Sequence, residues 1–169
     1  CTQYIASLLN QSRQQLQTTF AQRAAEQQTM TTALGKLIDK EPVFVTAETP
    51  TRAALEQMNA LRLGCMVVVD GDRRPVGVVT QSDLLPRVVL AGFDLARPIG
   101  ELMTANPHQL PATASAYDAA LEMATHGVRH LLVVTSDGIL KGVVSERDLF
   151  SLQRISLRQI RAGIDNAAD

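Results

Sequence analysis

Apolar residues follow two stretches of the chain in the same order and at a constant distance. Residues 34–84 and 99–149 align without a gap at an offset of 65, with 14 identities over 51 positions. Most identities are apolar residues, glycine or proline, whereas Asp83 and Asp148 place a carboxylate at the same point of both copies. Units of this length rarely bury a hydrophobic face alone, so we expect the copies to pack on each other around one core.

Each copy shows the same succession of periodic segments: a strand, a helix, two strands and a second helix. Helical spacing predicts helices over residues 51–61 and 116–125, and further helices from Thr80 to about residue 91 and from Ser145. The strands are predicted at residues 43–45, 66–69, 76–79, 109–110, 131–134 and 140–144. The second strand of each copy is continuously apolar, which is typical of a strand covered on both faces. The predicted fold class is α/β, with two β-α-β-β-α repeats related by pseudo-two-fold symmetry and preceded by a long helix.

The segments outside the repeats also show helical spacing. Residues 1–33 contain neither glycine nor proline and carry a thin apolar stripe, which predicts one long helix. This helix is interpreted either as a linker from an upstream domain or as a dimer-forming coiled coil, although Ser12 and Arg23 interrupt its stripe. A second stripe continues past the repeats to about Ile160. The predicted organisation is a linker helix over 1–33, repeat 1 over 34–92, repeat 2 over 93–150 and a C-terminal helix extension over 151–169.

Composition and charge argue against several classes of protein. The net charge is −1 and the basic residues are dispersed, so we expect no nucleic-acid-binding surface. No apolar run approaches the length of a membrane span and no signal peptide is visible, so we expect no membrane association and a cytoplasmic location. Cys1 and Cys65 show neither metal nor redox spacing, and we expect Cys65 to be a buried small apolar residue.

The candidate chemistry lies where each copy ends its last strand. Residues 77–83 and 142–148 both read Gly-Val-Val, a hydroxyl residue, two further residues and Asp. One interpretation is a capping box, in which the hydroxyl and the carboxylate satisfy backbone groups at the helix start. The other interpretation is a ligand site, because a helix N-terminus attracts anions, a hydroxyl can bind phosphate and a carboxylate can accept the hydroxyls of a ribose.

Over residues 34–150 the sequence resembles two tandem cystathionine-β-synthase (CBS) domains, the arrangement called a Bateman module. The resemblance rests on the start of each copy, on residues 126–134 and on the two Asp-containing segments. It implies AMP, ADP, ATP or S-adenosylmethionine as a regulatory ligand, with no required cofactor. It also implies that Asp83 and Asp148 hold ribose and that Thr80 and Ser145 contact phosphate. The base would lie along the first strand and the start of the second, at Val43, Val45, Cys65 and Met66 in repeat 1 and at His108, Leu110, His130 and Leu131 in repeat 2.

The distribution of charge makes repeat 2 the better candidate for an anion-binding site. Arg129, His130 and Arg147 are expected at its phosphate end, whereas the aligned residues of repeat 1 are uncharged. Arg129 and His130 are also consistent with a solvated loop before a buried strand. The histidines show no zinc spacing and no nucleophile or phosphate-loop motif is present, so we expect neither a metal site nor an enzyme.

The expected function is sensing of adenine nucleotides and signal transduction to covalently attached domains. The chain begins at Cys1 rather than Met, which suggests a fragment, and its flanks are similar to bacterial proteins with a cyclic-nucleotide-binding-like domain before the CBS pair and a nucleotidyltransferase-like domain after it. The alternatives are a ligand-free dimerisation scaffold and the regulatory part of a nucleotidyltransferase. We expect a homodimer built on an apolar helix surface. That surface is predicted to comprise Leu84, Leu85, Val88, Val89, Leu149 and Leu152.

Overall fold

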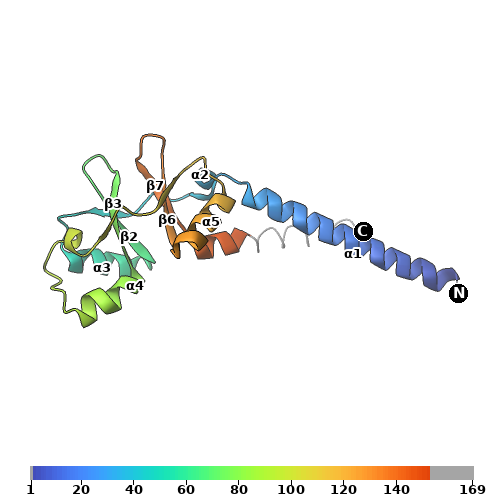
Figure 1. Ribbon diagram of the computed structural model, residues 1–169, viewed down its shortest axis with the longest axis horizontal. Coiled ribbons are helices and arrows are strands. Elements are labelled where there is room, and N and C mark those ends of the chain that lie inside the picture. The colour runs from blue at the N-terminus through green and yellow to red at the C-terminus, as the bar shows by residue number, and fades with distance from the viewer. Residues whose placement is uncertain (1, 153–169) are drawn as a thin grey trace.

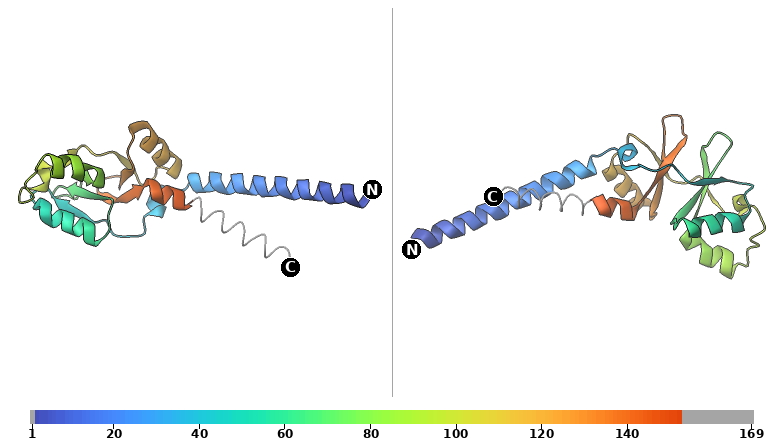
Figure 2. Two further views of the ribbon diagram at one scale, coloured as in Figure 1. Left: turned by 90° about the horizontal axis from the view of Figure 1, so that it is seen from below. Right: turned by 180° about the vertical axis from the view of Figure 1, so that it is seen from behind.

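A long helix projects from a body made of the two repeats. The computed structural model describes residues 2–152, and helix α1 (Thr2–Met30) confirms the predicted N-terminal helix. α1 points away from the strands in all views (Figures 1 and 2). Met30 at its end packs against the core of repeat 2. No helix of the described residues is long and apolar enough to span a membrane. The predicted continuation from residue 153 to Ile160 lies outside the described residues.

Both repeats have the predicted order of elements. Repeat 1 contains β1 (Phe44–Thr46), α3 (Thr51–Ala60), β2 (Cys65–Val69), β3 (Pro75–Thr80), α4 (Gln81–Asp83) and η1 (Leu84–Leu90). Repeat 2 contains β5 (Gln109–Pro111), α5 (Ala116–His126), β6 (His130–Val134) and β7 (Leu140–Ser145), followed by helical residues 146–152. The helix predicted from Thr80 is present, but η1 is a π-helix that contains Pro86. Proline cannot donate the backbone hydrogen bond that a regular α-helix requires at that point.

The strands form two sheets of matching topology. In repeat 1, β1 lies parallel to β2 and β2 lies antiparallel to β3. In repeat 2, β5, β6 and β7 repeat these pairings. The registers correspond as well, since Cys65 is paired with Thr80 and His130 with Ser145. The pseudo-two-fold relation therefore extends to individual residues.

Strand β2 is buried along its whole length because its two faces meet different partners. Met66 and Val68 belong to the core under α3, whereas Val67 and Val69 pack against Leu132 of the opposite repeat. Strand β6 alternates in the same way between the core under α5 and the contact between the sheets. The prediction that these apolar strands are covered on both faces is confirmed.

The first residues of each repeat are bound to the other repeat. The leading segment of repeat 1, α2 (Leu34–Leu37), donates backbone hydrogen bonds from Leu34 to Ala114 O at 2.8 Å and from Gly35 to Ala112 O at 2.9 Å. The leading segment of repeat 2, η2 (Ile99–Glu101), makes the equivalent bonds to repeat 1, from Ile99 to Thr49 O at 2.8 Å and from Gly100 to Ala47 O at 2.9 Å. A short strand β4 (Thr104–Ala105) then pairs with β3. The short elements α2, η2 and β4 had no clear periodicity in the sequence.

A glycine at equivalent positions of the two repeats, Gly77 and Gly142, allows side chains that follow the leading segments to approach the sheets closely. A Cβ on Gly142 of β7 would lie 2.6 Å from Ile38 Cγ2 and 2.9 Å from Ile38 Cδ1. In repeat 1 the side chain of Met103 lies where a Cβ on Gly77 would be. The identity of Gly77 and Gly142 in the aligned copies is explained by this close approach of the leading segments.

Part of the predicted dimer surface belongs to the core. Leu84 and Val88 pack against the core of repeat 1, Leu149 is only 8% exposed and Leu152 packs against the core of repeat 2. The prediction that these four form an exposed face is therefore wrong. They lie on the side of their helices that faces the sheets, as their spacing of three or four residues allows. The exposed apolar residues on the same helices are Leu85, Val89, Leu90 and Phe150.

Substitution of Gly142 by Ala tests the contact of the leading segment with the sheet. The new methyl group would overlap the β-branched side chain of Ile38, so we expect a loss of about 1–3 kcal/mol in the free energy of unfolding. Gly71→Ala is the matched control, because a Cβ there meets nothing within 4 Å, and it should be neutral or stabilising by up to about 1 kcal/mol. Urea denaturation measures both. Equal stability of the two variants would contradict the proposed steric role of Gly142.

Candidate functional site

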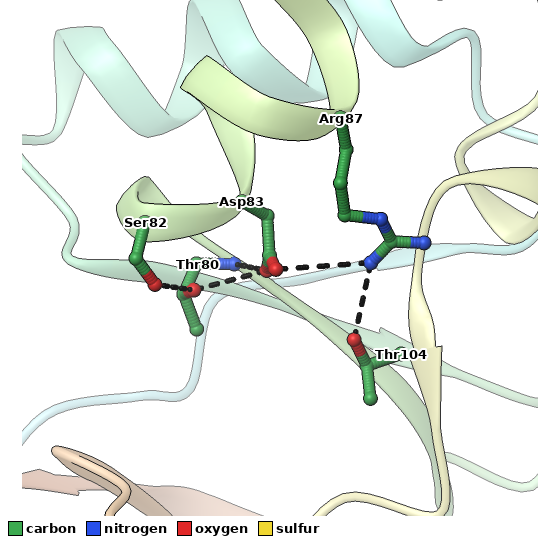
Figure 3. Close-up of polar contacts among 5 residues, drawn as sticks. All are labelled: Thr80, Ser82, Asp83, Arg87 and Thr104. Carbon is green, nitrogen blue, oxygen red and sulfur yellow. Dashed lines mark hydrogen bonds and ion pairs between the residues drawn. The ribbon is translucent and has the colours of Figure 1, made fainter. Parts of the chain in front are cut away.

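In repeat 1, the last strand passes into its helix through a capping box. Asp83 Oδ2 accepts hydrogen bonds from the backbone N of Thr80 at 2.8 Å and from Thr80 Oγ1 at 2.9 Å (Figure 3). The Thr80 hydroxyl also lies 2.8 Å from Ser82 Oγ. The capping-box interpretation of this motif is confirmed for repeat 1.

Repeat 2 has the same arrangement. Asp148 Oδ2 accepts from the backbone N of Ser145 and from Ser145 Oγ, each at 2.8 Å, and the backbone N of Asp148 donates to Ser145 Oγ at 3.2 Å. One carboxylate oxygen of each Asp is thus fixed by the start of the helix. The other carboxylate oxygen, Oδ1, takes no part in the capping box and can interact with another group.

The environment of this second oxygen differs between the repeats. In repeat 1, Arg87 Nη1 lies 3.7 Å from Asp83 Oδ1 and donates to Thr104 Oγ1 at 3.1 Å (Figure 3). The residue aligned with Arg87 in repeat 2 is Leu152, which packs into the core. Within residues 2–152, Asp148 forms no ion pair. Sequence reasoning missed Arg87, although its position four residues after Asp83 on a predicted helix was a usable signal.

Most residues predicted to line the base are core residues in the structure. Val45 and Met66 are buried under α3, and Val43 packs partly against the same group. Leu131 is buried under α5 and Leu110 packs partly there. Cys65 and His130, one position earlier on β2 and β6, point to the opposite face because side chains alternate along a strand.

Cys65 has the environment of an unreactive thiol. It is buried, and burial raises its pKa to about 12. The prediction that it is a buried small apolar residue is confirmed. Nucleophilic chemistry at Cys65 is disfavoured, because the reactive form of cysteine is the thiolate.

His130 lies where the two repeats meet. Its ring occupies the place that a Cβ of Gly64 would take, so the start of β6 rests on the residue before β2. The backbone N of Glu146 donates to Arg129 O at 2.9 Å, which holds the start of the second-repeat helix beside the start of β6. Burial lowers the pKa of His130, Asp148 opposes this shift and Arg129 adds to it. Arg129, His130, Ser145 and Asp148 therefore belong to one neighbourhood, and Arg147 is an exposed cation on the same turn.

His108 makes its side-chain contacts elsewhere. Its Nδ1 lies 3.7 Å from Glu122 Oε1 of α5, and its ring stacks on His126 with 4.3 Å between ring centroids. The backbone of His108 meets β6, where its carbonyl accepts from the backbone N of Leu132 at 3.1 Å. The histidine predicted to contact a base is thus engaged with α5.

Comparison with known proteins identifies the repeats. The family model of the CBS domain matches residues 34–89 and again residues 99–154. The chain belongs to the CBS domain family. CBS domain pairs are generally regulatory rather than catalytic.

Relatives of this CBS pair occur alone and inside larger proteins. A CBS domain protein from Pyrobaculum aerophilum, solved in complex with AMP, has a TM-score of 0.68 and 30% identity, and the match covers 78% of this chain and 99% of that one. An uncharacterised 17.7 kDa protein of Acidianus ambivalens is 29% identical over 71% of this chain and 72% of its own length. The meiotically up-regulated gene 70 protein of Schizosaccharomyces pombe is 33% identical over 60% of this chain, which spans only 14% of that protein.

The environment of His130 predicts a dependence of stability on pH. Because burial lowers its pKa in the folded chain, the unfolded state takes up the proton first as the pH falls below about 6.5. The contribution of the neutral ring is fully present above this pH and is lost as the pH falls towards the folded-state pKa. Urea unfolding between about pH 7.5 and pH 5.5 should show a steeper loss for the wild type than for His130→Gln. Identical slopes would contradict this account of His130.

Proposed function

We propose that this CBS pair is a regulatory module that binds an adenine nucleotide, with AMP the first candidate. Binding of the nucleotide would regulate attached domains. The observation that carries the proposal is the Asp148 carboxylate, fixed through Oδ2 to Ser145 while Oδ1 has no ion-pair partner among residues 2–152. The Pyrobaculum aerophilum relative in complex with AMP supports the choice of ligand. ADP, ATP and S-adenosylmethionine are the other candidates.

Asp148 is the proposed ribose ligand. A carboxylate oxygen has two lone pairs and can accept from both hydroxyls of a ribose. Because the cap holds Oδ2, little rotational freedom remains to be lost on binding, which favours affinity. The Ser145 hydroxyl at the start of the helix is the proposed contact for phosphate.

Arg129 and Arg147 are the proposed attraction for the phosphate charge. Both are exposed, and the bond from the backbone N of Glu146 to Arg129 O places their backbones close together. Charge-assisted hydrogen bonds from guanidinium groups are among the stronger polar contacts that a phosphate makes. The base is proposed to lie against the strand starts, with His130 on the face of β6 that turns towards repeat 1 and the backbone of residues 108–110 beside it.

Repeat 1 is proposed as the weaker site. Thr80 and Asp83 match Ser145 and Asp148, but Arg87 already lies beside Asp83 Oδ1. A ribose would have to displace that partly exposed ion pair before it could bind the carboxylate. Exposed ion pairs contribute about 1 kcal/mol or less, so this lowers affinity without preventing binding.

Regulation would follow from where the site lies. Its residues come from β6, β7 and the helix that begins at residue 146, and the chain beyond residue 152 continues from that helix. A ligand that binds one arrangement of these elements better than another shifts their population. We propose a cytoplasmic setting, in which adenine nucleotides are present.

Thermal unfolding with AMP tests the nucleotide site. With AMP at about 100 times its dissociation constant, binding should raise the free energy of unfolding by roughly 2.7 kcal/mol. This corresponds to an increase of about 5–10 °C in Tm for a domain of this size. Asp148→Asn should remove most of this shift, since the amide nitrogen cannot accept from ribose, while still providing a cap oxygen for Ser145. Asp83→Asn is the matched control and should keep most of the shift.

The outcomes separate the candidate functions. Equal losses in the two variants would contradict the preference for repeat 2. No shift of the wild type with AMP, ADP, ATP or S-adenosylmethionine would favour the ligand-free dimerisation scaffold, with both Asp residues acting only as helix caps. The nucleotidyltransferase alternative places catalysis outside this chain, so it is tested by activity of a longer protein.

We also propose that the chain forms a homodimer through the exposed apolar residues of η1 and of residues 146–152. Leu85 and Phe150 occupy aligned positions, and both helices lie on the lower side of the strands in Figure 1. Light scattering should give twice the chain mass of 18.3 kDa. Val89→Lys should shift the protein towards monomer, whereas Leu61→Lys at the end of α3 should not. A monomeric wild type at high concentration would overturn this arrangement.

A further inference from the structure

Three metal-ligating side chains meet on the surface of repeat 2, outside the proposed nucleotide site. They are His108 from the loop before β5 and Glu122 and His126 from α5. Glu122 and His126 are four residues apart on α5 and share one face of the helix. His108 joins them because β5 runs beside β6, which follows α5 in the chain. In the part of the chain that the structure describes, no other group of three His, Cys, Asp or Glu residues has this proximity.

The separations among the donor atoms suit a small transition-metal ion. His126 Nε2 lies 3.1 Å and His108 Nδ1 lies 3.7 Å from Glu122 Oε1, and one donor atom from each residue lies within 4.8 Å of the others. Ligands of a tetrahedral zinc ion stand about 3.4 Å apart, given metal–ligand bonds of roughly 2.0–2.2 Å. Two of the three edges of the site are therefore within a few tenths of an ångström of the bound geometry.

The chemistry of the donors narrows the choice of ion. Two imidazoles and one carboxylate form a donor set that suits zinc and its neighbours rather than magnesium or calcium, which prefer oxygen ligands throughout. The side chains are 41%, 33% and 41% exposed for His108, Glu122 and His126, so the ion can enter and a water can complete the coordination.

The position on the helix also favours a cation. His126 is the last residue of α5, where the carbonyl groups carry the partial negative charge of the helix dipole. An ordinary surface pair between Glu122 and His126 explains one contact, but it does not explain why a second imidazole from a distant segment stacks on the first. One divalent ion satisfies all three donors together.

We propose that His108, Glu122 and His126 form a binding site for zinc or a similar divalent transition-metal ion. The bound ion would tie the start of β5 to the C-terminal end of α5 within repeat 2. This proposal is independent of nucleotide binding, since it shares no side-chain donor with Ser145 or Asp148.

Zinc titration of the chain by calorimetry tests the site. The experiment uses a Cys1→Ser background, which removes the terminal thiol as a competing ligand, and a buffer free of chelator. We expect one ion per chain, and loss of more than about 100-fold in affinity for His108→Ala and for His126→Ala, because even outer-sphere substitutions at metal sites cost about 10–100-fold. His130→Ala is the matched control, since His130 is the only other histidine of the sequence, and should keep the affinity.

A second measurement keeps the result independent of folding effects. Cobalt(II) added in place of zinc should give the visible absorption of a four-coordinate ion in the background chain and in His130→Ala, and not in His108→Gln or Glu122→Gln. Circular dichroism checks that these surface variants remain folded. Absence of binding in the background chain, or binding that His108→Ala and His126→Ala leave unchanged, would overturn the proposal.

Discussion

The reciprocal hydrogen bonds of the two leading segments are the constraint on which the rest of the fold depends. Leu34, at the start of repeat 1, is fully buried in the core of repeat 2, and Ile99, at the start of repeat 2, is fully buried in the core of repeat 1. Neither repeat therefore completes its own core. The four backbone bonds tie the two repeats together, and β2 and β6 pack against each other between them.

This constraint also positions the candidate site. Packing of the sheets brings the starts of β2 and β6 together, so that His130 rests on Gly64, and Thr80 and Ser145 are the strand partners of Cys65 and His130 at these starts. The capping box gives Asp148 two roles. It satisfies backbone groups at the helix start, and it orients the carboxylate that a ligand would use. The structural and functional interpretations of Asp148 are thus compatible.

Sequence reasoning reached what is local and periodic. The strands and helices of both repeats follow from apolar spacing, and the caps follow from a hydroxyl and a carboxylate three residues apart. Contacts between distant segments left no such signal. The apolar stripe that contains Leu149 does not by itself say which side of the helix faces the sheet. The meeting of His108 with α5 depends on strand pairing. Arg87 meets Asp83 one helical turn later, and the aligned position in repeat 2 is a leucine, so the repeat pattern does not point to this ion pair.

The exchange of leading segments has a consequence for how such a protein can arise. If the linker between the repeats were cut, the same four hydrogen bonds would join two separate chains, and the pseudo-symmetry would be the two-fold axis of a swapped dimer. Joining the halves covalently holds each segment near its acceptor at a high effective concentration, so association no longer depends on the amount of protein in the cell. Once joined, the halves are free to diverge. Arg87 in repeat 1 and the aligned Leu152 in repeat 2 are an example of such divergence at equivalent positions.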